Sequence, residues 1–289
     1  MKNFISGSRI IAAALFVLVA CIFGCSSGES HIIKMRLAKG DVFVQNTTMK
    51  MDMKMMGMDM KMDVETGVSF EVMKKSEAET ELKMTYTKMH STMNMSGQPT
   101  GLPNTDSLIN APGKRIVGKS VMMKISTDNK ITAITGIEDI LMDPTADSAT
   151  RKMMEKMFSK EQMGNLFGMI FSMYPKQAVK IGESWNAETN ASMGGANMKI
   201  AMKYTLLSVK DGLADIGVTG IINGKGDMET GGMKIQMDMK GGQKGNMVVN
   251  MADGYLKTSS YKMDLDADMN MMGQKLSMTM NADYGVSGN

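Results

Sequence analysis

Residues 49–62 read MKMDMKMMGMDMKM, and this stretch decides the fold. Methionine alternates with lysine or aspartate from Met49 to Met55, and the alternation resumes in the opposite phase after Met56-Gly57. A period of two places successive side chains on opposite faces of a β-strand. A change of phase at a glycine is typical of a tight turn or a bulge. The stretch therefore predicts a β-hairpin with methionines on one face and charged side chains on the other.

The same pattern recurs near the other end of the chain. Residues 263–271 alternate in this way, and the phase changes after Met272-Gly273. A second likeness joins Lys39-Gly40-Asp41-Val42-Phe43 to Ile181-Gly182-Glu183-Ser184-Trp185. Charged turns also separate alternating segments at 74–77, 128–129, 210–212 and 253–254. These similarities predict two duplicated β halves, residues 31–140 and 176–289.

Between the halves the apolar period changes to that of a helix. Asp147 or Ser148 is suited to cap a first helix, and Ser159-Lys160-Glu161-Gln162 resembles a capping box that starts a second. The second helix carries an apolar stripe, which includes Met163, Leu166, Phe167, Ile170, Phe171 and Tyr174, and it ends before Pro175.

The predicted fold is mainly β. We expect residues 31–289 to form a single domain, with a helical insert at 145–174 between the two halves. The halves should form one large, curved antiparallel sheet, similar to a half-barrel. The helical pair has apolar surface to bury, and the methionine-rich concave face of the sheet is the available partner. Met163, Leu166, Phe167 and Ile170 would then lie over an apolar ligand site as a lid.

The N-terminus predicts a secretory signal with a lipobox. Lys2 and Arg9 precede an apolar run, and this run ends at Cys25, which is followed by Ser26-Ser27-Gly28. Residues 1–24 would be the signal peptide, and residues 25–30 a polar tether. We expect acyl chains such as palmitate on Cys25, with Cys21 as the alternative. The protein would thus be held in the bacterial cell envelope, in the outer membrane, facing the periplasm or the cell surface.

Composition argues against several classes of function. The formal net charge is only +3, and acids and bases are interleaved, which does not favour nucleic-acid binding. The whole chain has two histidines, and both cysteines lie at the signal junction. No nucleophile motif or phosphate-binding glycine loop is present. We therefore expect no enzymatic activity and no cofactor, whereas the oligomeric state stays open.

The 39 methionines leave three interpretations of the function. Methionine is flexible and polarizable, which suits a surface that binds an apolar ligand or partner of variable shape. Thioethers also bind Cu(I), and Met51, Met53, Met58 and Met60 are the candidate ligands for such an ion. Because methionine is spread over every predicted element, we favour no metal site. The third interpretation is a structural surface lipoprotein in which methionine only fills the core.

The Lys39–Phe43 motif, the strands around Met55-Met56-Gly57, Gly182-Glu183-Ser184-Trp185 and the segment from Tyr204 to Gly212 also carry a family resemblance. They resemble a family of bacterial lipoproteins known only as a domain of unknown function, DUF6263. The resemblance implies a lipid-anchored β protein and brings no activity or site residue with it. The predicted order of a β half, two helices and a second β half is also similar to that of periplasmic half-barrels that carry lipoproteins. This second likeness is an analogy of architecture alone.

Overall fold

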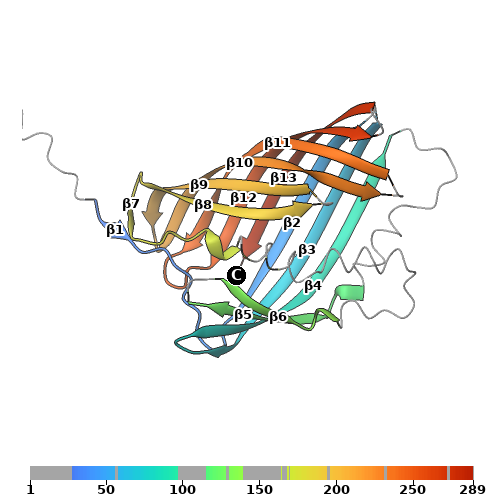
Figure 1. Cartoon of the computed structure of the whole chain (residues 1–289). Coiled ribbons are helices and arrows are strands. Elements are labelled where there is room, and N and C mark those ends of the chain that lie inside the picture. Colours follow the sequence, from blue (N-terminus) through green and yellow to red (C-terminus); the bar gives the residue numbers. More distant parts are fainter. Residues whose placement is uncertain are drawn as a thin grey trace, which may run out of the picture.

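The computed structural model describes residues 28–55, 58–96, 115–127, 130–138, 164, 168, 170–193, 196–230, 233–271 and 274–288. Within these residues, eleven strands form one antiparallel sheet in the order β6-β5-β4-β3-β2-β13-β12-β11-β10-β9-β8. The sheet is strongly curved but not closed, and β6 and β8 are its two edges (Figure 1). The prediction of a large curved antiparallel sheet is thus confirmed.

Each half of the sheet is an up-and-down series of neighbouring strands. The first series consists of β2 (Val42–Met55), β3 (Met58–Lys75), β4 (Glu79–Met95), β5 (Ser120–Ser126) and β6 (Ile131–Thr135). The second consists of β8 (Ser184–Met193), β9 (Ala196–Lys210), β10 (Leu213–Thr230), β11 (Met233–Asn250), β12 (Leu256–Met271) and β13 (Gln274–Gly288). The two short strands β1 (Ser30–His31) and β7 (Val179–Lys180) pair separately. The two series are joined where β2 pairs with β13.

The hairpins predicted from the methionine pattern are present. Met55 pairs with Met58 at the β2–β3 turn, and Met271 pairs with Gln274 at the β12–β13 turn. These turns, with the β10–β11 turn, lie at one end of the sheet, called the distal end below. The β3–β4, β9–β10 and β11–β12 turns and β1 lie at the opposite, proximal end.

The two faces of the sheet carry different side chains, as the alternation of apolar and charged residues along the strands predicts. On the outer face, lysines and acids are exposed and form ion pairs such as Lys61–Asp52 at 3.8 Å and Lys199–Glu188 at 2.9 Å. Pairs of this exposed kind contribute little stability, about 0–1 kcal/mol each. The apolar side chains face inwards, so burial on the inner face is what stabilises the fold.

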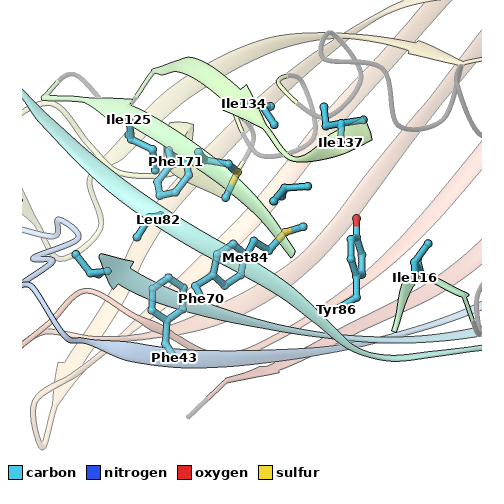
Figure 2. Close-up of a cluster of buried hydrophobic side chains, with 13 residues drawn as sticks. Phe43, Phe70, Leu82, Met84, Tyr86, Ile116, Ile125, Ile134, Ile137 and Phe171 are labelled. Carbon is cyan, nitrogen blue, oxygen red and sulfur yellow. The ribbon is translucent and has the colours of Figure 1, made fainter. Parts of the chain in front are cut away.

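Two core clusters fill the proximal half of the inner face. The first core cluster consists of Phe43, Phe70, Val72, Leu82, Met84, Tyr86, Ile116, Val121, Met123, Ile125, Ile134, Ile137 and Phe171 (Figure 2). The second consists of Ile33, Met173, Tyr174, Val179, Tyr204, Leu206, Ala214, Ile216, Val218, Met247 and Val249. Aromatic stacking adds to the burial, since the Phe43 ring lies 4.8 Å from Phe70 and 4.7 Å from Tyr255.

A bulge changes the inward phase along β4. The register of β3 and β4 shifts between Gly67 and Val68, where a Cβ on Gly67 would lie 2.6 Å from Thr87 Oγ1. Glycine lets the two backbones come this close. Leu82, Met84 and Tyr86 are buried before the shift, and Met89, Ser91 and Met93 are buried or half-buried after it. The bulge thus keeps apolar residues inside along the whole strand while the strand bends.

The two similar sequence motifs form similar turns. Gly40 and Gly182 have φ values of +89° and +87°, in the left-handed region that favours glycine. The Asp41 carboxylate accepts the Ala38 N–H at 2.7 Å, and the Glu183 carboxylate accepts the Lys180 N–H at 2.8 Å. The sequence likeness at these two sites therefore corresponds to one hydrogen-bonded turn that is built twice.

The predicted helical pair is not supported. The first predicted helix lies outside the described residues. Of the second, residues 164, 168 and 170–172 are helical, so one short helix is found where a pair was expected. The expectation relied on apolar periodicity and caps, which do not show how much of such a segment is held by tertiary contacts. None of the helices in the described part of the chain has the length and apolar character of a membrane span.

Candidate functional site

A third apolar cluster covers the inner face towards the distal end and is here called the methionine face. Its buried members are Ile222, Met239, Leu265, Ala267 and Met280, and its partly buried members are Met51, Met53, Met198, Ile200, Met237, Met263 and Met278. Met60 and Met62 of β3 are half-buried and pair directly with Met53 and Met51. Alternation alone placed these methionines on one face, and the structure confirms that placement.

The register aligns the methionine face in rows that cross the sheet. One row contains Met60, Met53, Met280, Leu265, Gly241, Ile222 and Ile200, each paired with the next. Directly paired side chains in an antiparallel sheet have Cβ atoms about 4.5–5.5 Å apart, so neighbours along a row are in reach of each other. The rows therefore form a continuous apolar surface over seven strands.

Glycines on β10 let the methionines of the neighbouring strands fill part of this surface. A Cβ on Gly224 would lie 2.8 Å from Met239 Cε and 3.0 Å from Met198 Cγ. A Cβ on Gly220 would lie 2.6 Å from the Met202 sulfur. Flexible thioether side chains thus cover the glycine backbone. Met51, Met53, Met60 and Met62 on β2 and β3 keep part of their surface accessible, as do Met198, Ile200 and Met237 on β9 and β11.

Some methionine sulfurs accept hydrogen bonds. The Gln243 amide donates to the Met202 sulfur at 3.1 Å, and the Tyr261 hydroxyl donates to the Met247 sulfur at 3.6 Å. Thioether sulfur is a weak acceptor, but it gives these two part-buried donors a hydrogen-bond partner inside the sheet. Burial raises the pKa of Tyr261 to about 12, which keeps its hydroxyl a donor at neutral pH.

The structure places two of the four candidate copper ligands directly opposite each other. Met53 lies opposite Met60, but Met51 lies opposite Met62, and Met58 lies opposite Met55 at the distal tip. Met58 is 46% exposed. Thioether pairs of this kind could contribute two ligands to a soft ion, and a third would come from the next strand. Within the described residues, no group of three or more histidine, cysteine or acidic side chains is placed to hold a metal.

The predicted lid residues have a mixed outcome. Met163, Leu166 and Phe167 lie outside the described residues, as do Cys21 and Cys25. Ile170 is half-buried against the first core cluster, not over the methionine face. Its neighbour Phe171 is 3% exposed and belongs to the same cluster. Ile170 thus packs against the proximal core and not where a lid over the methionine face would lie, and a ligand site at these four residues stays a prediction.

The segment 170–174 spans the space between the two edges of the sheet. Phe171 packs in the cluster that contains Ile134 and Ile137 beside edge strand β6. Trp185 on edge strand β8 donates its indole N–H to the Met173 carbonyl at 2.8 Å. The Tyr174 hydroxyl donates to the Gly254 carbonyl at 2.7 Å, and burial raises its pKa. This segment therefore completes the proximal core, and the link to Trp185 had no signal in the sequence.

These features define an open, curled antiparallel β protein with a filled proximal core and a methionine-lined distal inner face. A family described as "Family of unknown function (DUF6263)" matches residues 77–256, which is more than half of the sequence. The chain belongs to this family. The match runs from the start of β4 to the start of β12, so the β2–β3 methionine hairpin lies outside it.

Comparisons with other proteins give little beyond this. A search of curated proteins finds no match. Among solved structures, lipovitellin, described as "Lipid-protein interactions in lipovitellin", is 8% identical with a TM-score of 0.49; the match covers 88% of this chain and 25% of that one. The COG4313 outer membrane channel from Pseudomonas putida F1 is 9% identical with a TM-score of 0.26, and covers 88% and 97%. The β domain of the Bordetella autotransporter BrkA is 6% identical with a TM-score of 0.25, and covers 85% and 98%. Scores this low carry no argument about function.

Proposed function

We propose that this chain is a lipid-anchored protein of the bacterial cell envelope that binds an apolar ligand on its methionine face and catalyses no reaction. The observation that supports the proposal is the larger share of partly buried side chains on the methionine face. There, seven apolar side chains, including Met51, Met53 and Met263, are partly buried against five that are buried. In both proximal clusters the buried residues outnumber the partly buried ones, and segment 170–174 contributes to them.

Partly buried methionines are suited to such a role for two physical reasons. Each Å² of apolar surface that a ligand covers contributes about 25 cal/mol, so a chain of methylene groups gains affinity along a row of methionines. The unbranched thioether also adapts its rotamer to different ligand shapes, which makes the surface tolerant. The charged outer face, with its lysine and acid pairs, offers no comparable apolar surface.

The test introduces polar side chains of similar size into the methionine face. The double variant Met51→Gln/Met263→Gln leaves two buried amides poorly hydrogen-bonded in the bound state, which costs about 1–3 kcal/mol each. We expect binding of a fluorescent fatty-acid probe to weaken at least about 10-fold. Met73→Gln is the matched control, because Met73 is 39% exposed and lies outside the methionine face.

A second measurement asks whether a natural ligand is present. Organic extracts of the protein purified from its native host should contain a lipid or another apolar molecule in stoichiometric amount. Equal probe binding by the wild type and both variants, together with empty extracts, would refute ligand binding. The structural lipoprotein would then be the better description.

Copper binding stays as the alternative from a different class. Its support is the row in which Met53 lies between Met60 and Met280 on the two neighbouring strands. A Cu(I) site needs three or four soft ligands, often with histidine, and this row offers three thioethers. Competition with a Cu(I) chelator is the measurement. Binding tighter than micromolar that is lost in Met53→Leu/Met60→Leu would favour copper over the apolar ligand, and we expect no such binding.

A further inference from the structure

A separate pocket lies at the proximal end, far along the strands from the methionine face. Its volume is about 300 Å³, and it lies between residues 34–37, the β3–β4 turn and the end of β5. The lining residues from the N-terminal segment alternate: Met35 and Leu37 pack against the first core cluster, whereas Lys34 and Arg36 carry the charge. A pocket of this volume is at the small end of ligand sites and suits a compact group.

The charged residues that line the pocket in the described part of the chain, Lys34, Arg36 and Lys75, are all basic. Among the described residues, none of these three cations has a carboxylate within 4.0 Å, unlike outer-face lysines such as Lys61 and Lys199. The carboxylates of Glu79 and Glu81 are both bound by Lys124, at 3.0 and 3.2 Å. Within the described part of the chain, ion pairs therefore do not neutralise these three cations.

Two of the three cations are held in place by neutral partners. Arg36 donates through Nη1 to the carbonyl oxygens of Met251, at 2.5 Å, and Ala252, at 3.0 Å. Lys75 donates to the Thr80 hydroxyl at 2.9 Å. Carbonyl and hydroxyl partners fix a cation without neutralising it. Thr80 and Thr127 also line the pocket, and each carries a hydroxyl that can donate to an oxyanion.

We propose that this pocket binds a phosphate group. A phosphate has a charge near −2 and three acceptor oxygens, which match three cations and two hydroxyl donors better than a carboxylate does. The apolar floor of Met35, Leu37 and Ile125 lowers the local dielectric, so the interaction is stronger than on an open surface.

The phosphate has two chemical sources, a free phosphate ester or the headgroup of a phospholipid. The proposed lipid anchor at Cys25 favours a phospholipid headgroup as the source of the phosphate. This choice of source rests on the proposed function. Four residues lie between Cys25 and Ser30, where β1 begins, so these two Cα atoms are at most about 18 Å apart. A membrane that holds the anchor would therefore lie near β1, which ends three residues before Lys34.

The experiment uses the full mature protein in a neutral detergent and measures binding by titration calorimetry. One arm titrates inorganic phosphate and glycerol 3-phosphate, and the other titrates short-chain phosphatidic acid, whose headgroup is also a phosphomonoester. The pocket variant is Lys34→Gln/Lys75→Gln. The control is Lys203→Gln/Lys240→Gln, which removes the same charge from exposed positions on the outer face.

We expect the wild type and the control to bind alike and the pocket variant to bind at least about 10-fold more weakly. Tighter binding of the soluble phosphates than of the lipid would support the pocket with a free phosphate ester as its ligand. Tighter binding of the lipid would support it with a headgroup as its ligand. Equal binding by all three proteins, or no binding to the wild type in either arm, would overturn the proposal. Because the readout does not involve the methionine face, failure here leaves the proposed function standing.

Discussion

Phe171 tests whether segment 170–174 is a permanent part of the core or a removable cover. Its ring is 3% exposed and lies among the buried side chains of the first core cluster, which also contains Ile134 of β6 (Figure 2). Replacement of a buried phenylalanine by alanine in a filled core costs about 3–5 kcal/mol. We expect Phe171→Ala to fall in this range. Ile170→Ala, in the same segment but half-buried, should cost less, about 1–2 kcal/mol.

The assay is equilibrium unfolding in urea, followed by circular dichroism. With a slope of about 3 kcal/mol per M, a loss of 3–5 kcal/mol lowers the midpoint by about 1–1.7 M. If Phe171→Ala loses less than about 1 kcal/mol and also increases binding of a hydrophobic probe, the segment does not complete the core. It would then be a lid, and the filled proximal half described above would be the wrong interpretation.

Three further results are expected. Cys25→Ser should release the protein from the membrane fraction and Cys21→Ser should not; an acylated N-terminal peptide that begins at Cys21 would reverse this assignment. Burial raises the pKa of Tyr86 from its ordinary value of 10 to about 12, so ionisation favours the unfolded chain. The contribution of Tyr86 should be intact below pH 10 and fall by about 2–3 kcal/mol as the pH rises through 12. Other tyrosines with raised pKa values add to the total loss, so the wild type should lose about 2–3 kcal/mol more than Tyr86→Phe over this range, measured by the urea midpoint. Gly182→Ala should destabilise the protein by about 1–2 kcal/mol in thermal unfolding, because φ at this residue is +87° and an added Cβ would meet no other atom, so only backbone strain acts. Gly40→Ala should have the same effect, and a neutral effect of both variants would contradict the left-handed turn.

Sequence predicted the local parts of this fold well. The β2–β3 hairpin follows from alternation and from one phase change at Met56-Gly57, and both signals lie within a few residues of the turn they specify. The inward placement of Met51, Met53 and Met60 follows from the same period. The likeness between residues 39–43 and 181–185 was visible in the sequence, whereas the left-handed turn that both form was found only in the structure.

The non-local parts were not predictable for a physical reason. The pairing of β2 with β13 joins strands from opposite ends of the chain. The sequence of neither strand indicates which other strand it pairs with. The indole contact between Trp185 and Met173 depends on how far the sheet curls. The cations of the proximal pocket, Lys34 and Lys75, are brought together only by the packing of the N-terminal segment beside β4 and β5.

The β2–β13 junction also sets the order in which the sheet can be assembled. Within each series of strands, every pairing joins neighbours in the chain, so these contacts close short loops and form early. The junction pairs Gln45 with Gly288 and Met55 with Met278, and closing so long a loop carries a larger entropic cost. Until that pairing forms, β2 and β13 are both free edges lined with methionine, which are open to pairing with other chains. A folding chain is therefore most prone to aggregation in the period before β2 pairs with β13.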